Sequence, residues 1–271
     1  MNSNQHAARF LARHCVFAVV VACCVSVVIA EDKTAAPPGV DAKADSVLRQ
    51  MSATLAAAPS FTVDAEQSID QSDESGQKIQ MSKRVHAAVT RPNRLAATVK
   101  GDADNLAYFY DGKTVTIVNH ADHVHALQEV PDTIDAMFDV LAERYGVTAP
   151  LSDLLFSDPY KAMMTHVRSG RYVGIHEVAG VKCHHLAFRQ DALDWQIWIE
   201  DGQRPLPRKV VLTFKEQPGY PQFAAVLNNW DLSAKPKSDA FTAVIPADSK
   251  RVDLEPLPTR AESPASAKGG K

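Results

Sequence analysis

The first hydrophobic positions of the folded region recur with helical spacing. Val47, Leu48, Met51 and Leu55 lie one, three and four residues apart, which gathers them on one face of a helix. Pro59 ends this pattern, because the residue before a proline is disfavoured in the helical conformation. The sequence therefore predicts an amphipathic helix that ends before Pro59.

After Pro59 the hydrophobic positions alternate with polar ones. Phe61, Val63 and Ala65 show the two-residue period of a half-buried strand. Asp111 and Gly112 stand between two β-rich runs and favour a tight hairpin turn. The predicted strand-forming runs of this half are residues 61–69, 78–90, 94–99, 108–118 and 123–128.

The period changes again between residues 131 and 165. The stripe of an amphipathic helix appears in the spacing of five apolar residues, Ile134, Met137, Phe138, Leu141 and Tyr145. Residues 151–164 add one or two short helical turns, with Ser152 or Asp153 as a cap and Pro159 opening the second turn. We predict a helical insertion here.

Beyond Gly170 the alternating pattern returns. The predicted strands are residues 172–180, 182–190, 193–200, 207–215, 222–232 and 240–245. Helices and strands do not alternate, and short meandering connections favour an antiparallel sheet. We predict a mainly β (α+β) fold, with one large curved antiparallel sheet, an N-terminal helix and a helical insertion over its concave face.

The N-terminus has the features of a secretory signal peptide. Arg9 and Arg13 precede an apolar run from Cys15 to Ile29, which closes on the small residue Ala30. We predict a signal peptide over residues 1–30 and a periplasmic location. Two alternatives stay open: a lipoprotein anchored at Cys23, and an uncleaved anchor, for which the run is shorter than the usual 20 or so residues.

Composition sets the remaining boundaries. Residues 31–43 contain a linker rich in alanine and proline, and residues 248–271 are predicted to be a polar, Pro-rich disordered tail. Between them, residues 44–247 are predicted to form a single domain, with residues 131–165 as an insertion or lid.

Without residues 1–30 the chain carries 27 basic and 32 acidic residues, a net charge of −5, and Cys183 as its single cysteine. A single cysteine forms no internal disulfide, so the core must hold the fold. Mild acidity gives no electrostatic case for nucleic acid, and no phosphate loop or nucleophile elbow appears. We expect no cofactor, no nucleic-acid partner and no enzymatic activity.

Cys183, His184 and His185 form an unusual triplet in a predicted strand. Cys183 and His184 point to opposite faces, so they cannot act as nucleophile and base. Cys183 and His185 share a face and could both reach a metal, but further ligands at zinc spacing are missing nearby. We favour Cys183 as a buried structural residue over metal binding, and metal binding over catalysis.

A second set of histidines lies at His120, His123 and His125. His123 and His125 share a face of a strand, so a surface zinc or copper site is conceivable. Their spacing does not match the usual zinc signatures. We predict no metal site and keep these three as weak candidates.

Aromatic and apolar residues suggest a cavity for a ligand. Trp195 and Trp198 lie on opposite faces of one predicted strand, so one of them could line a concave site while the other packs under a loop. The stripe on the insertion helix is either core or part of a lid. The candidate cavity and lid residues are Ile134, Met137, Phe138, Leu141, Trp195 and Trp198.

The ordered motifs of the folded region also resemble a known family. They include ADSVLRQMSATLAAAPSFTVDAEQ, RPNRLAATVKGD, YFYDGKTVT, PDTIDAMFDVLAERYGV, PLSDLLFSDPY, VAGVKCHHLAF, DWQIWIEDG and PLPRKVV. Together, from about Ala44 to Pro246, they resemble the bacterial "domain of unknown function 2092" (DUF2092) of predicted periplasmic proteins.

That family is similar to the LolA and LolB lipoprotein carriers and to the sensor domain of RseB-type envelope-stress regulators. The resemblance implies an incomplete antiparallel β-barrel round a helical plug, with a hydrophobic cavity that takes acyl chains. One scaffold hosts several functions, so the fold follows more directly than the function.

Three functions remain open. The leading hypothesis is a non-enzymatic periplasmic carrier or chaperone for an acyl chain, a lipid or a lipoprotein. The alternative is an envelope-stress sensor or scaffold that binds a partner protein. A hydrolase or metalloprotein is the least favoured, because no set of acid, base and nucleophile can be assembled.

Overall fold

The computed structural model describes residues 36–257 of the chain. The predicted signal peptide, the candidate lipid attachment at Cys23 and most of the predicted C-terminal tail lie outside the described residues. Within residues 36–257 no helix is long and apolar enough to cross a membrane.

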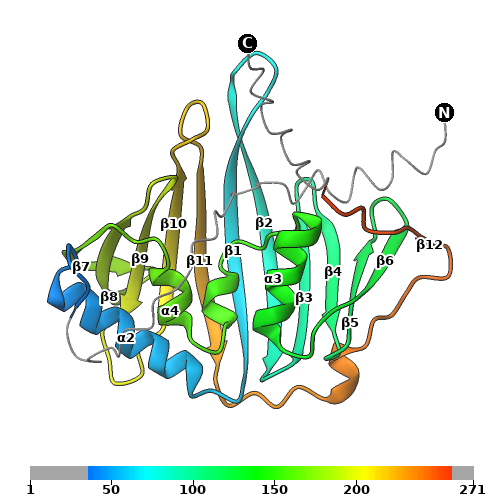
Figure 1. Cartoon of the computed structure of the whole chain (residues 1–271), viewed down its shortest axis with the longest axis horizontal. Coiled ribbons are helices and arrows are strands. Elements are labelled where there is room, and N and C mark those ends of the chain that lie inside the picture. Colours follow the sequence, from blue (N-terminus) through cyan, green and yellow to red (C-terminus); the bar gives the residue numbers. More distant parts are fainter. Residues whose placement is uncertain (1–35, 258–271) are drawn as a thin grey trace, which may run out of the picture.

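Twelve strands of the described region form one sheet (Figure 1). Their order is β12-β6-β5-β4-β3-β2-β1-β11-β10-β9-β8-β7. Every neighbouring pair is antiparallel except β12 and β6. The strands are β1 (Ser60–Ser72), β2 (Lys78–Thr90), β3 (Arg94–Gly101), β4 (Asn105–Tyr110), β5 (Thr114–Asn119), β6 (Val124–Glu129), β7 (Ser169–Val178), β8 (Val181–Arg189), β9 (Leu193–Glu200), β10 (Pro207–Phe214), β11 (Gln222–Asp231) and β12 (Lys250–Arg251).

The sheet consists of two meanders that meet at its centre. The first runs outward from β1 to β6, and the second runs inward from β7, at the opposite edge, to β11. Strands β1 and β11 then pair with each other, for example at Ala65 and Leu227. The connection from β6 to β7 therefore has to cross the width of the sheet, and this is the segment that carries the helical insertion.

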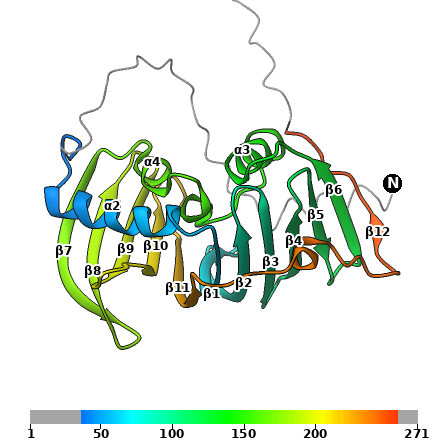
Figure 2. The ribbon, with the colours of Figure 1, turned by 90° about the horizontal axis from the view of Figure 1, so that it is seen from below.

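The first helix, α2 (Ala42–Ala56), covers the half of the sheet built by the second meander. Its apolar stripe is fully buried, because Leu48, Met51 and Leu55 have no exposed surface. Figure 2 shows α2 lying across β7 to β10. At about 1.5–3 kcal/mol for each buried leucine or methionine, this stripe holds the helix to the sheet.

The insertion forms α3 (Ile134–Tyr145), the 3₁₀ helix η1 (Ser152–Leu155) and α4 (Pro159–Met164). Thr133 caps α3 by accepting a hydrogen bond from the Ala136 amide, and Gly146 ends it in the left-handed conformation. Asp158 caps α4 in the same way through the Lys161 amide. Ser152 and Asp153 do not cap η1, so that prediction is wrong.

All three helices of the insertion lie on the same face of the sheet as α2 (Figure 2). Helix α3 lies over the first meander, whereas α4 lies beside α2 over the second meander (Figure 1). The prediction of a mainly β fold, with an open curved sheet covered by an N-terminal helix and a helical insertion, is confirmed.

Two predictions for the C-terminal part are wrong. Residues 240–245 are not a strand, because the chain forms the 3₁₀ helix η2 (Ser238–Phe241) there and leaves Val244 79% exposed. The predicted disordered tail from residue 248 is ordered as far as the description reaches. Strand β12 pairs with β6, and the Leu257 amide donates a hydrogen bond to the Arg144 carbonyl at the end of α3.

Candidate functional site: a cavity beneath the helical insertion

A cavity of about 470 Å³ lies between the concave face of the sheet and the insertion. Its floor comes from β1, β2 and β3 of the first meander and from β9, β10 and β11 of the second. Its roof comes from α3, α4 and residues 147–155. The volume falls within the range of about 300–1,000 Å³ that is usual for small-molecule sites.

The floor is hollow because small side chains meet at its centre. Ala65, Ala87 and Ala97 all line the cavity, and Ala87 pairs directly with Ala97 across β2 and β3. Bulky residues at these inward positions would fill the space below α3. Most of the surrounding floor residues are also apolar, namely Val63, Ile69, Met81, Val85, Leu95, Val99, Leu193, Val210, Leu212, Phe223 and Leu227. Polar groups are added toward one end of the floor by Gln67, Gln71, Ser82 and Lys83.

Two tryptophans form part of the wall. Trp195 on β9 is stacked on Phe188, with ring centroids 4.0 Å apart. Trp230 on β11 lies 5.6 Å from the Phe61 ring, and its indole nitrogen donates a hydrogen bond to the Pro207 carbonyl. The Trp195 and Trp230 side chains both line the cavity. Their contacts with neighbouring side chains and backbone hold the two rings in place.

Sequence alternation does not reveal the position of Trp230. Strict alternation would place it with Val226 and Asn228, on the face opposite Leu227. A β-bulge interrupts the β1–β11 register at this point, with Asn229 at a φ of 50°. The extra residue turns Trp230 onto the concave face.

The predicted cavity residues separate into two groups. Phe138, Leu141 and Trp195 line the cavity. Ile134 and Met137 are each 1% exposed, belong to the core beneath α3 and do not line the cavity.

Trp198 is not part of the cavity either. Its ring lies 3.9 Å from that of His185, and the Lys209 ammonium group lies 4.9 Å from its centroid. By strand alternation this stack is on the convex face. A binding role for any of these residues stays a prediction.

The roof loop, which we define as residues 147–153, runs from the end of α3 into the first turn of η1 and contacts both the cavity and solvent. Ala149, Pro150 and Asp153 line the cavity and are exposed. Leu151, between them, has a φ of 72°, a left-handed conformation that is strained for a leucine. Within this loop Val147 and Leu151 pack against the core, whereas Ala149 and Pro150 face solvent.

Asp153 lies at the rim of the cavity, where its side chain lines the cavity and is also exposed to solvent. Desolvation by the surrounding protein raises its pKa above the ordinary value of 3.8, although the side chain stays accessible from the open side of the cavity. Within residues 36–257 its carboxylate has no hydrogen-bond or ion-pair partner.

The far end of the insertion is fastened to α2 by a buried polar cluster. Tyr160 donates a hydrogen bond of 2.5 Å to Asp45, which is 3% exposed, and Arg49 donates to Asp45 at 2.7 Å. Arg49 also donates to the Tyr160 hydroxyl, and the Tyr160 amide donates to the Ser52 hydroxyl. Desolvation and the neighbouring Asp45 raise the pKa of Tyr160 well above its usual range.

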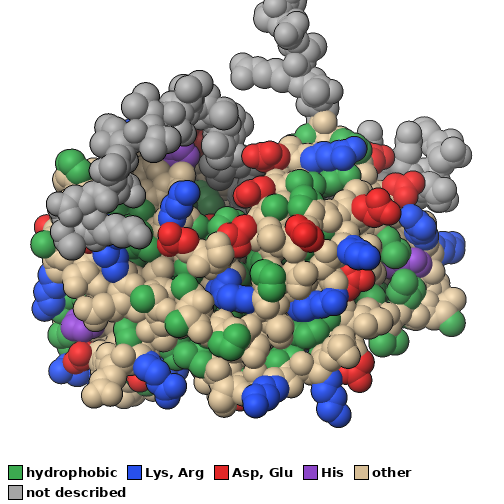
Figure 3. Space-filling model, turned by 60° about the horizontal axis from the view of Figure 1, so that its bottom comes forward, with side chains coloured by type: hydrophobic (Ala, Val, Ile, Leu, Met, Phe, Trp, Pro, Cys, Tyr) green, Lys and Arg blue, Asp and Glu red, His purple; other side chains and the backbone are tan. Residues whose placement is uncertain are grey.

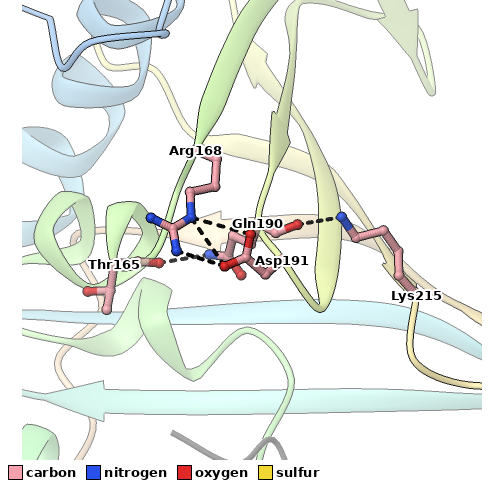
Figure 4. Close-up of polar contacts among 5 residues, drawn as sticks. All are labelled: Thr165, Arg168, Gln190, Asp191 and Lys215. Atoms are coloured by element: carbon pink, nitrogen blue, oxygen red, sulfur yellow. Dashed lines mark hydrogen bonds and ion pairs between the residues drawn. The ribbon is translucent and has the colours of Figure 1, made fainter. Parts of the chain in front are cut away.

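A second set of contacts fastens the same end to the β8–β9 turn (Figure 4). Gln190, which also lines the cavity, donates its amide to the Thr165 carbonyl at 2.9 Å. Arg168 binds Asp191 at 2.7 Å, and Lys215 donates to the Gln190 carbonyl. The α4 end is therefore anchored, and the roof loop lies between this anchor and α3.

The cysteine and histidine triplet has structural contacts. Cys183 has no exposed surface, and burial raises the pKa of its thiol to about 11. His184 binds Tyr172 and Asp201, whereas His185 contacts His176 and Gln196, each ring nitrogen at 3.0 Å. Among the described residues, no three His, Cys, Asp or Glu side chains gather in a way that could hold a metal.

The second histidine set is also divided among separate partners. His123 pairs with Asp248 at 2.6 Å, and His125 lies 2.9 Å from the Ser249 hydroxyl. These contacts join the β5–β6 turn to the segment that leads into β12. His120 is exposed and takes part in neither contact.

The surface carries no large patch of one charge on the face that Figure 3 shows. Lysine and arginine side chains are interspersed with aspartate and glutamate, and hydrophobic groups lie between them. This mixture agrees with the near-balanced composition of 29 basic and 32 acidic residues.

A family model matches residues 44–255, which is most of the folded region. The family is described as "Predicted periplasmic protein (DUF2092)". The chain belongs to this family. The resemblance stated from the sequence motifs is thereby confirmed, and the periplasmic description applies to the family as a whole.

Comparison with curated proteins gives no match. Among solved structures, the lipoprotein LppX from Mycobacterium tuberculosis is 12% identical with a TM-score of 0.42, over 72% of this chain and 98% of LppX. MucB is 17% identical with a TM-score of 0.42, over 79% of this chain and 67% of MucB.

A LolA superfamily protein from Nitrosomonas europaea is 8% identical with a TM-score of 0.35, over 74% and 97% of the two chains. At such TM-scores the likenesses add nothing to the case for any function.

Proposed function

We propose that this DUF2092 protein is a non-enzymatic periplasmic carrier or chaperone that holds an acyl chain, of a lipid or a lipoprotein, in the cavity beneath α3. The observation that carries the proposal is the space of about 470 Å³ with mostly apolar walls. A cavity left unfilled costs stability, so a protein that keeps one gains from an occupant.

The walls suit a hydrocarbon chain. Alanine, valine, leucine and tryptophan side chains offer contact without hydrogen bonds that the chain could not satisfy. Burial of apolar surface contributes about 25 cal/mol per Å². The binding energy thus comes from burial of the chain, with little dependence on a single contact.

Loading and release are assigned to the roof loop. Its neighbours α3 and α4 are held by caps and by the Asp45–Arg49–Tyr160 cluster, whereas Ala149 and Pro150 are exposed. Movement of residues 147–153 opens the cavity without unfolding either helix. Such loop opening is a common way to exchange a buried ligand.

Native mass spectrometry of the protein purified gently from the periplasm, followed by lipid extraction, tests the proposal. A co-purified lipid in a one-to-one ratio supports it and identifies the cargo. A protein that is empty and also takes up no fatty-acid probe contradicts it. In that case retention of a specific envelope protein would favour the alternative, a sensor or scaffold module.

A pair of neighbouring substitutions on β3 localises the binding. Ala97→Phe fills the floor of the cavity, and Ala96→Phe adds the same ring on the opposite face of the same strand. Loss of space for about two methylenes lowers affinity about tenfold in Ala97→Phe. Ala96→Phe keeps the affinity of the unmodified protein. Equal binding by both variants would place the ligand elsewhere.

A further inference from the structure

The cavity has an unbalanced charge. Lys83 is its one cationic lining residue within the described chain, and Asp104 already neutralises it at 3.1 Å. Both of these side chains are largely buried, at 24% and 12% exposure. Asp153 is the remaining charged lining residue, and it has no partner among the described residues.

The backbone holds Asp153 at this position. Leu151 adopts its left-handed conformation two residues earlier, and Leu154, one residue later, is 2% exposed in the core. The Leu154 amide donates a hydrogen bond to the Leu151 carbonyl and closes the turn. Asp153 is therefore held at the rim of the cavity, where its side chain meets both the cavity and solvent.

We propose that the ligand is an amphiphile with a single hydrocarbon chain whose polar end is a protonated amine, and that Asp153 binds this amine at the rim of the cavity. The inference rests on the proposed function and adds the chemical class of the ligand. The chain lies along the alanine floor, and the amine lies at the roof, where the carboxylate is unpaired.

Electrostatics decides against a free fatty acid at this position. Two carboxylates at the rim of the cavity would repel each other, whereas an ammonium and a carboxylate attract, and the apolar walls beside them make this attraction stronger than in bulk water. An ammonium group donates three hydrogen bonds, and a carboxylate only accepts them. The cavity volume of about 470 Å³ is in the lower half of the usual range, which suits one chain.

Three probes with the same sixteen-carbon chain test the inference. Hexadecylamine is positive at pH 7, palmitate is negative, and hexadecanol is neutral. The dissociation constants are measured by calorimetry or by displacement of a fluorescent probe. We expect hexadecylamine to bind about tenfold or more tightly than palmitate, with hexadecanol between them.

The matched variants are Asp153→Asn and Glu143→Gln. Both remove one negative charge from the roof, but Glu143 is exposed on α3 and does not line the cavity. We expect Asp153→Asn to abolish the preference for the amine and to keep the affinity for hexadecanol. Glu143→Gln should keep both.

The results with the three probes distinguish a failure of the amine assignment from a failure of the proposed carrier function. If none of the three probes binds, the carrier function itself fails. If all three bind but show no preference, or if Asp153→Asn leaves the preference unchanged, only the assignment of Asp153 is overturned.

Lysophosphatidylethanolamine, as a fourth probe, identifies the source of the amine. Binding as tight as that of hexadecylamine assigns it to a phospholipid head group. Weaker binding assigns it to a simple long-chain amine. Either result supports the role of Asp153 once the first comparison has succeeded.

Discussion

At the scale of single residues, the proposed ligand class depends on Asp153. Its carboxylate lies in a space where ionisation is disfavoured, and its pKa is raised for that reason. A carboxyl pKa that is raised beside a cavity is a common feature of binding sites, and it is consistent with the proposed role of Asp153.

The pH dependence of Asp153→Asn follows from this raised pKa. Because the folded state binds the proton more tightly than the unfolded state, stability is lost as pH rises above 3.8 and through the folded pKa. We expect Asp153→Asn to have a higher free energy of unfolding than the unmodified protein at pH 7. The difference should vanish below pH 3.8, where the acid is neutral in both states.

Denaturant unfolding at several pH values measures this difference. Glu143→Gln is the control, because its exposed carboxylate is hydrated in both the folded and the unfolded state. An Asp153→Asn variant that is less stable than the unmodified protein at pH 7 would show that the carboxylate has a structural partner.

At the scale of elements, the insertion is fastened by more side-chain contacts at α4 than at the roof loop, residues 147–153. Helix α4 has only six residues and would not persist alone. Its position depends on the cluster of Asp45, Arg49 and Tyr160 and on the bond from its backbone to Ser52. This cluster fixes one side of the roof loop.

Tyr160→Phe tests this anchor. The substitution removes the donor to Asp45 and leaves a buried carboxylate with one bond fewer, which costs about 1–3 kcal/mol of unfolding free energy. Tyr220→Phe is the control, because Tyr220 is 62% exposed, and we expect a change below about 0.5 kcal/mol. Equal values for the two variants, measured by denaturant unfolding, would contradict an anchoring role.

Most helices and strands could be predicted, because the spacing of their hydrophobic residues indicates which side chains are buried. The predicted strand over residues 193–200 matches the bounds of β9, since one face of that strand is buried and the other is half-buried. Residues 240–245 also alternate, but they follow β11, whose two edges are already occupied by β1 and β10. With no free edge beside it, this segment forms η2 instead of a strand.

The cavity was only partly predictable. Phe138, Leu141 and Trp195 follow from the apolar stripe and from strand alternation. Trp230 does not, because the bulge at Asn229 shifts it to the other face. A small residue such as Ala97 does not by itself predict a cavity, because the sequence does not show which segment covers it.

At the scale of the whole molecule, the cavity is shared by both meanders. The first contributes its alanine floor, the second contributes both tryptophans, and the insertion contributes the roof. A ligand in the cavity therefore contacts residues that are far apart in sequence, and its binding links the two halves of the sheet.

Tryptophan fluorescence can follow this contact. Trp195 and Trp230 line the cavity, whereas Trp198 lies beside His185 on the convex face. We expect ligand uptake to change the emission of the Trp198→Phe variant as much as that of the unmodified protein. The change should fall by roughly half in Trp195→Phe or Trp230→Phe, since two of the three indoles face the ligand. A change that survives only when Trp198 is present would place the ligand on the opposite face.

The pairing of β1 with β11 also determines the order in which the protein can assemble. Asn229 and Asp64, which are hydrogen-bonded across this seam, are 165 residues apart in the chain. Contacts between such distant residues form late, because a long loop must close first. For a chain made from its N-terminus, each meander can form locally, but the cavity is complete only after β11 has been synthesised and has joined β1. Under the proposed carrier function, the protein can therefore bind its ligand only after β11 has paired with β1.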